Sequence, residues 1–146
     1  SNTASAPPTE TCMTCHSQLR VGTPQTQAVV DSWNAQVPLQ WNRVHELPDF
    51  VYFNHSAHVN NGVGCSSCHG RIDEMTQIWK NQPMTMGWCL ECHRNPAKAL
   101  RPVSEVFNMA YQPLPEPNSQ LALGATLVEA YHIDTDKLIQ CSTCHR

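Results

Sequence analysis

All eight cysteines of the 146-residue chain occur in pairs with two residues between them, and a histidine directly follows each pair. The cysteines of these four Cys-x-x-Cys-His motifs are Cys12 and Cys15, Cys65 and Cys68, Cys89 and Cys92, and Cys141 and Cys144. The histidines that follow them are His16, His69, His93 and His145. Cysteines three apart share one face of a helical turn, so their sulfurs can bond to the two vinyl groups on one edge of a haem. The next residue then lies under the ring, where its imidazole can bind iron, and the motif therefore predicts four covalently attached haem c groups.

Other uses of paired cysteines explain the pattern less completely. Two Cys-x-x-Cys pairs can form a zinc site with four cysteine ligands, and secreted chains use cysteines in disulfides. Neither use predicts a histidine after every second cysteine. A thioredoxin-like motif occurs once, in a βαβ unit, and not four times. The four histidines therefore favour haem attachment.

The chain has four more histidines, as many as the axial positions that four such haems leave free. These are His45, His55, His58 and His132. We therefore expect four six-coordinate, low-spin haems with two histidine ligands each. Methionine is the competing axial ligand and would raise the reduction potential. The five methionines, which we expect to pack against haem faces instead, are Met13, Met75, Met84, Met86 and Met109.

Two histidine ligands close both axial faces of the iron, so no position stays open for a substrate. The pattern therefore predicts an electron-transfer protein and not an enzyme in its own right. A multihaem reductase needs one five-coordinate haem. That alternative requires one of the four additional histidines not to bind iron.

The composition excludes several other classes of protein. The net charge is -3 and no lysine-rich block is present, which argues against nucleic acid as a partner. No apolar run approaches the roughly 18 residues of a membrane helix. Charged residues make up only 14% of the chain and hydrophobic residues 40%, so we expect the haems themselves to form the core.

Periodic patterns are few and short, so we expect mainly irregular chain with short α-helices and little or no sheet. The sequence predicts helices over residues 26–36, 73–81 and about 119–131. It predicts an extended arm over 1–10, a loop over 37–48, a short extended stretch over 50–53 and a linker over 113–117. Since metal coordination couples to folding, we expect the chain to be unfolded without haem.

The spacing of His55 and His58, just before Cys65, resembles the His-x-x-His arrangement of small multihaem cytochromes of the c3 and c7 type. The resemblance implies a c7/c3-like fold. It also implies that the first histidine binds the haem of the next motif and the second binds a neighbouring haem. By that resemblance, His55 pairs with His69 and His58 pairs with His93. We also expect His45 to pair with His16, and His132 with His145, although exchanged partners are an open alternative.

Longer strings resemble the multihaem cytochrome c subunit of alternative complex III. They are PPTETCMTCHSQ, LPDFVYFNHSAHVNNGVGCSSCHG, MTMGWCLECHRNP, VFNMAYQP and CSTCHR, which together run from Pro7 to Arg146. The resemblance implies a periplasmic subunit of a quinol-oxidising complex, associated with the inner membrane through its partners. Those partners are an iron–sulfur subunit, integral membrane quinol-binding subunits and a monohaem cytochrome c.

The chain departs from that family in its number of haem motifs. The family's subunit typically carries five haems and an N-terminal membrane anchor. We therefore expect either a single four-haem domain over residues 1–146 or a segment of a longer five-haem subunit. A free periplasmic or extracellular electron shuttle, or a subunit of a conducting filament, is the alternative function.

Overall fold

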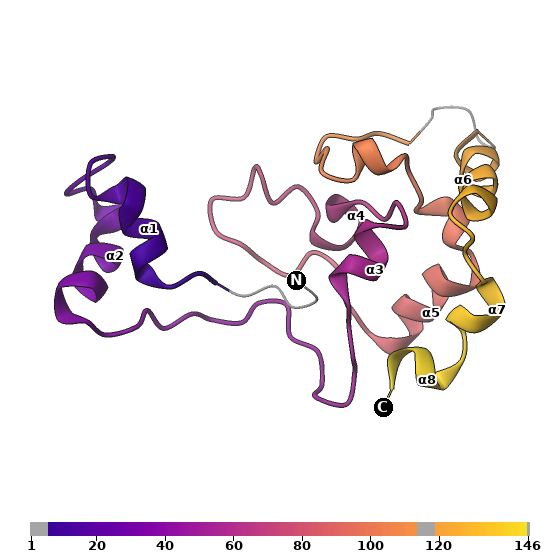
Figure 1. Cartoon of the computed structure of the whole chain (residues 1–146), viewed down its shortest axis with the longest axis horizontal. Helices are drawn as coiled ribbons and strands as arrows, with labels where there is room; N and C mark the ends of the chain where they lie inside the picture. Colours follow the sequence, from indigo (N-terminus) through magenta and orange to yellow (C-terminus); the bar gives the residue numbers. More distant parts are fainter. Residues whose placement is uncertain (1–5, 114–118, 146) are drawn as a thin grey trace. The chain divides into compact units, whose positions relative to one another are not determined.

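The computed structural model describes residues 6–113 and 119–145, and it divides the chain into two compact units (Figure 1). One unit is Ala4–Arg43, and the other runs from Val44 to the C-terminus. Each unit contains at least one of the cysteine motifs. The single four-haem domain expected from the sequence stays a prediction.

The first unit consists of two helices that pack against each other, α1 (Thr9–His16) and α2 (Pro24–Ala35). The Thr9 and Ser32 hydroxyls are 2.8 Å apart and join the two helices. The buried Thr26 donates a hydrogen bond from its hydroxyl to the Arg20 carbonyl at 2.7 Å and so fixes the connecting turn. Proline at the first position of α2 suits a helix start, because that N–H would have no partner.

The predictions for this part of the chain are largely confirmed. The helix expected over 26–36 is α2, and the loop expected over 37–48 contains no regular element. The predicted arm is two residues too long, because α1 already begins at Thr9, after Pro8. Residues 1–5 of that arm lie outside the described residues.

The second unit contains short helices joined by irregular chain (Figure 1). In order, they are α3 (His55–Val59), α4 (Cys65–His69), α5 (Met86–Arg94), the 3₁₀ turns η1 (Pro96–Lys98) and η2 (Val103–Glu105), α6 (Ser119–Ala130), α7 (Thr135–Leu138) and α8 (Cys141–Cys144). The helix expected over 119–131 is confirmed as α6. The linker predicted over 113–117 lies almost entirely outside the described residues.

Each Cys-x-x-Cys-His motif contains a helical turn, as the spacing of its sulfurs requires. The motifs occupy the end of α1, all of α4, the second half of α5 and α8. In the fourth motif the helix ends at Cys144, and His145 has extended backbone angles. A turn of helix brings the two cysteines onto one face, from which both can bond to a single haem.

Helix α6 packs directly on η1, and Gly124 permits this close approach. A Cβ atom at Gly124 would overlap the Ala97 carbonyl group. Nearby, the Gln120 side-chain amide donates to the Leu100 carbonyl at 2.7 Å. Leu100 and Val106 are the only fully buried hydrophobic side chains in the described part of the chain, so aliphatic packing provides a very small core.

Extended structure is limited to two isolated bridges in the described residues, Val51 with His145 and Val63 with Leu100. The stretch predicted to be extended over 50–53 thus contributes a single bridging residue. The predicted fold class, mainly irregular chain with short α-helices and little or no sheet, is confirmed. No helix of the described chain is long and apolar enough to span a membrane.

The helix predicted over residues 73–81 is wrong. Arg71 forms ion pairs with Asp73 and Glu74 and holds only a turn there. Ile78 and Trp79 are 43% and 55% exposed, so an apolar helix face would have no surface to pack on. A helix of nine residues depends on such packing, because its own hydrogen bonds barely offset the cost of nucleation.

Candidate functional site

Helix α3 carries two of the predicted iron ligands within a single turn, and Asn54 fixes where that turn begins. The Asn54 side-chain oxygen accepts hydrogen bonds from the Ser56 backbone N–H at 2.9 Å and from the Ser56 hydroxyl at 2.7 Å. The Asn54 carbonyl accepts a hydrogen bond from Nδ1 of His58 at 2.9 Å. The Phe53 ring packs against the His55 and His58 imidazoles, with ring centroids 4.7 and 4.6 Å away. Asn54 and Phe53 together therefore fix the directions of both histidines.

Two pairs of imidazoles face each other across similar gaps. The His55 and His69 rings are nearly parallel, with an interplanar angle of 6° and centroids 6.4 Å apart. The His58 and His93 rings are 6.1 Å apart at 30°. An imidazole nitrogen binds a first-row metal at about 2 Å, so two imidazoles on opposite sides of one iron have centroids roughly 6 Å apart. The spacing of each pair therefore fits the two axial ligands of a six-coordinate haem iron.

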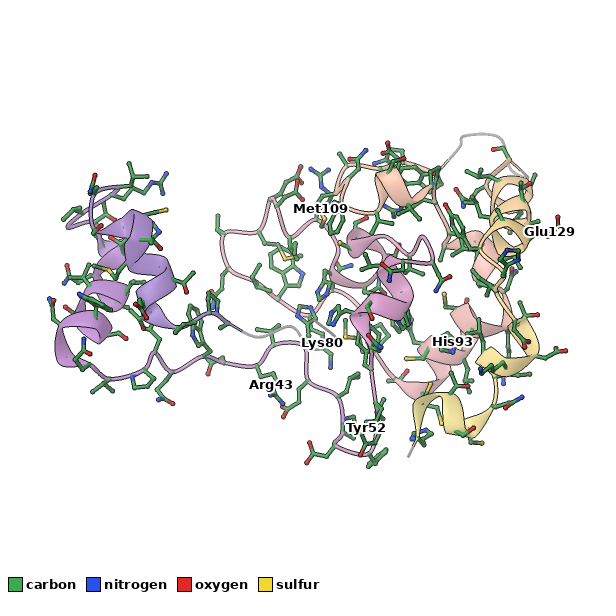
Figure 2. The ribbon with its side chains drawn as sticks, in the orientation of Figure 1. Arg43, Tyr52, Lys80, His93, Met109 and Glu129 are labelled. Carbon is green, nitrogen blue, oxygen red and sulfur yellow. The ribbon has the colours of Figure 1, made fainter. Side chains whose placement is uncertain are left out.

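Four of the eight histidines bond through Nδ1 to a backbone carbonyl. These contacts are His16 to Leu19 at 3.2 Å, His58 to Asn54 at 2.9 Å, His93 to Leu138 at 3.0 Å and His145 to Phe50 at 3.3 Å. A carbonyl can only accept, so Nδ1 carries the proton and Nε2 keeps its lone pair for a metal. Figure 2 shows His93 on α5, beside the segment of α7 that supplies the Leu138 carbonyl.

The His55 and His69 pair lacks such contacts. Nδ1 of His55 is buried without a hydrogen-bond partner, and neither nitrogen of His69 forms a hydrogen bond with any described residue. The His45 ring instead lies edge-on to His69, with centroids 4.4 Å apart. Nε2 of His45 is also buried without a partner.

The fourth motif is held by the residues around Phe50. The Tyr52 backbone N–H donates to the Cys144 carbonyl at 2.8 Å, and Val51 forms its bridge with His145. The Phe50 ring lies 5.8 Å from the His145 ring. The structure thus places this aromatic stretch against the histidine of the fourth motif.

The structure does not test the other two predicted pairs. His132 follows α6 in a left-handed conformation, with φ of 53°, and its ring contacts no other aromatic ring of the described residues. His16 belongs to the unit Ala4–Arg43, and His45 belongs to the other unit. The pairings of His16 with His45 and of His145 with His132 therefore stay predictions.

Burial favours the neutral form of one imidazole in each pair, His58 in one and His69 in the other. It is the main cause that lowers the pKa of His58, against the opposing effect of the Asn54 hydrogen bond. Burial likewise lowers the pKa of His69, with smaller contributions from His45 and His55. Only a neutral imidazole has a lone pair for iron, so this environment suits a ligand.

The cysteines of three motifs lie near one another, and none of the eight forms a disulfide. Burial, together with the nearby Cys92, Cys89 and Cys65, raises the pKa of Cys68 to about 11. Burial also raises the pKa of Cys89, and Cys144 adds to the shift. Thiol–disulfide oxidoreductases need the opposite, a lowered thiol pKa. Cys68 and Cys89 therefore do not resemble the cysteines of a thiol redox site.

One residue at the second motif was not identified from the sequence. Arg101 is only 6% exposed. Its guanidinium donates to the hydroxyls of Ser66 and Ser67, both at 3.2 Å. It also donates to the Asn108 carbonyl at 3.2 Å and lies 4.3 Å from the centre of the Tyr111 ring. No sequence signal links Arg101 to a motif 35 residues earlier, because only the folded chain brings them together.

The sequence model of the cytochrome c3 family matches residues 57–146, which is more than half of the chain. The chain belongs to the cytochrome c3 family. It is therefore a multihaem cytochrome c that carries c-type haem with its iron and serves haem-based electron transfer. Members of the cytochrome c3 family are typically periplasmic or extracellular. A search among curated proteins found no match.

The cytochrome c3 match covers only part of the predicted ligand set. It includes the three motifs that begin at Cys65, Cys89 and Cys141, together with His58 and His132. It does not include the first motif, His45 or His55. The first haem site of this cytochrome c3 relative thus rests on its Cys-x-x-Cys-His motif alone.

Proposed function

We propose that the chain binds four haems c, each with two histidine ligands, and conducts electrons between partner proteins. The observation that carries this proposal is the spacing of the two imidazole pairs, 6.4 Å for His55 with His69 and 6.1 Å for His58 with His93. When bound, each haem iron supplies a one-electron ferric–ferrous couple. Two histidines per iron leave no axial position for a substrate, which favours electron transfer over catalysis.

The chain's own residues have three tasks in this function. The cysteine pairs hold each haem in place, and the imidazoles fix the coordination of iron. The backbone carbonyls of Asn54 and Leu138 orient His58 and His93 through Nδ1. Such outer contacts restrict the ring and raise the basicity of the ligand. Because His55 and His58 share one turn of α3, their two sites are held as close neighbours.

We propose further that this electron transfer takes place in a periplasmic subunit of alternative complex III. The haem-flanking strings, above all LPDFVYFNHSAHVNNGVGCSSCHG and MTMGWCLECHRNP, support this role. The partners would be an iron–sulfur subunit, integral quinol-binding subunits and a monohaem cytochrome c. The match to the cytochrome c3 family favours a second candidate, a free periplasmic or extracellular electron carrier.

Mass spectrometry and electron paramagnetic resonance of the purified, oxidised protein test the haem count and ligation. We expect the mass of the chain plus four haems and only low-spin signals of bis-histidine type. A mass equal to the bare chain would end the proposal. A high-spin signal would point to an open iron and thus to a multihaem reductase, and a near-infrared sulfur-to-iron band would point to a methionine ligand.

Purification of the tagged chain from native cells tests the role in the complex. We expect it to co-purify from detergent-extracted membranes with an iron–sulfur protein and integral membrane subunits. Recovery of the protein only as a monomer from the periplasmic fraction would instead support the free carrier. Both outcomes are compatible with four bis-histidine haems, so the two parts of the proposal are tested separately.

A further inference from the structure

The two imidazole pairs that share α3 have different electrostatic surroundings. Arg101 lies at the motif that begins at Cys65, where its guanidinium contacts the two serines between the cysteines. Gly64, directly before Cys65, also adjoins it, since a Cβ at Gly64 would overlap the guanidinium. The charge of Arg101 is thus placed at one particular haem site.

The charge of Arg101 is poorly compensated. No carboxylate of the described residues lies within ion-pair distance of the guanidinium, and its Nε is buried without a partner. Burial is the main influence on the pKa of Arg101 and lowers it, while Glu105 opposes this shift with a smaller effect from beyond ion-pair distance. The Glu105 carboxylate also accepts a hydrogen bond from Asn108 at 2.7 Å. The vinyl and propionate groups of a haem lie on opposite edges of the porphyrin. The edge bonded to Cys65 and Cys68 is therefore the one without propionates.

A buried positive charge acts strongly because the protein interior screens it little. Oxidation of ferrous to ferric iron adds one positive charge to the haem. Arg101 therefore disfavours the ferric state at the site of Cys65 and Cys68, which raises the reduction potential of that haem.

The hydrogen bonds that the imidazoles donate add to the same difference in reduction potential, because they lower the potential of the other haem. Both imidazoles of the other pair donate through Nδ1 to carbonyls, His58 to Asn54 and His93 to Leu138. A ligand that donates in this way is more basic and stabilises ferric iron. Neither His55 nor His69 has such a contact among the described residues.

We propose that the haem at Cys65 and Cys68 has a higher reduction potential than the haem at Cys89 and Cys92, and that the buried guanidinium of Arg101 is a main cause. This inference rests on the proposed ligation of the two irons by the imidazole pairs. It makes the site beside Arg101 the preferred location of an electron shared between the two neighbouring haems.

A redox titration of the wild-type holoprotein followed by nuclear magnetic resonance tests the order without any substitution. Haem-methyl resonances are assigned through the protons of the cysteines that carry each haem. We expect the haem of Cys65 and Cys68 to become reduced first as the potential is lowered. The reverse order would overturn the proposal. Low-spin bis-histidine signals from both haems in the same sample would show that the proposed ligation still holds.

Substitution of Arg101 tests the cause. In R101Q we expect the haem of Cys65 and Cys68 to shift to a lower potential, while R101K keeps the charge and most of the wild-type value. R71Q is the matched control, since Arg71 is only two residues from His69 but has a side chain that is 38% exposed and is paired with Asp73 and Glu74. We expect R71Q to shift this haem much less than R101Q.

Three results would contradict the role of the charge. They are an unchanged potential in R101Q with all haems low-spin, equal shifts in R101Q and R101K, and an R71Q shift as large as that of R101Q. If R101Q does not fold, the proposal is still tested by the order in which the two haems of the wild-type protein are reduced. The comparison of R101K with R71Q is also still available. R101K keeps the charge, so a clearly lower reduction potential of the haem at Cys65 and Cys68 in R101K would then count against the proposal.

Discussion

The imidazole pairs His55/His69 and His58/His93 are similar in spacing but differ in what surrounds them. The first pair is nearly parallel, has no hydrogen bond to a backbone carbonyl and lies at the motif that contacts Arg101. In the second pair, both rings donate to carbonyls. Two irons that each have two histidine ligands can thus differ in reduction potential, because the outer contacts and nearby charges differ.

The largest effect on this comparison should come from replacing one ligand of each pair with methionine. We expect H55M to raise the potential of the haem at Cys65 and H58M to raise that of the haem at Cys89. Axial ligands span about 0.8 V of haem potential, and histidine–methionine ligation lies above bis-histidine ligation. Redox titration with near-infrared spectroscopy measures both variants. We expect the near-infrared methionine band from only one haem in each variant. A shift in the reduction potential of the same haem in both variants would contradict the pairing.

The next largest effect concerns the small core beside Arg101. Leu100 is 1% exposed, and we expect L100A to lower the free energy of unfolding by about 2–5 kcal/mol. The loss should disturb the haem at Cys65 more than the haem at Cys89. Chemical denaturation gives the free energy, and haem-methyl spectra show which site changes. The matched control is L121A. Because Leu121 is 41% exposed, this substitution should lower the free energy of unfolding far less.

Acid should weaken both sites, since each contains a histidine whose pKa is lowered by burial, His69 in one and His58 in the other. The unfolded chain takes up protons below about pH 6.5, while these imidazoles in the folded chain take them up only at a lower pH. The unfolding free energy should therefore be fully present above that pH and fall as the pH decreases, by at most about 1.4 kcal/mol per pH unit for each group. Denaturation at pH 5 and pH 8 measures this. Equal stability at both pH values would contradict it.

The smallest effect should come from α7, whose Leu138 carbonyl holds His93. The Asp134 side chain accepts a hydrogen bond from the Lys137 backbone N–H at 3.1 Å and caps this helix. We expect D134A to cost about 1 kcal/mol of stability. It should also raise the potential of the haem at Cys89 slightly, by loosening the His93 contact. D134N keeps the cap and removes the charge. If D134N raises the potential of the haem at Cys89 as much as D134A does, the cause is the lost charge and not the lost cap.

The sequence allows the local parts of these sites to be predicted. The cysteine spacing predicts the helical turns, which are present in all four motifs. The His-x-x-His arrangement and its family resemblance imply the two pairs whose rings the structure brings together, although their binding of iron stays a prediction. These features depend on residues close in sequence, where helix geometry alone fixes the relation between side chains.

Features that depend on tertiary contacts could not be predicted in this way. Arg101 contacts Ser66 across 35 residues, and the carbonyl that holds His93 comes from Leu138, 45 residues later. The helix expected over 73–81 was wrong for a related reason. Its apolar residues suggest an amphipathic helix, but Ile78 and Trp79 are exposed in the folded chain, and the local ion pairs of Arg71 favour a turn.

Helix α3 has a consequence for how the cytochrome matures. Its five residues follow the capping residue Asn54, and they carry one ligand for each of two irons. Under the proposed ligation, insertion of either haem orders this turn and presents the second histidine in the right direction for the next insertion. Loading of the two sites should therefore be cooperative during biogenesis, and chains that have received only one of these two haems should be scarce.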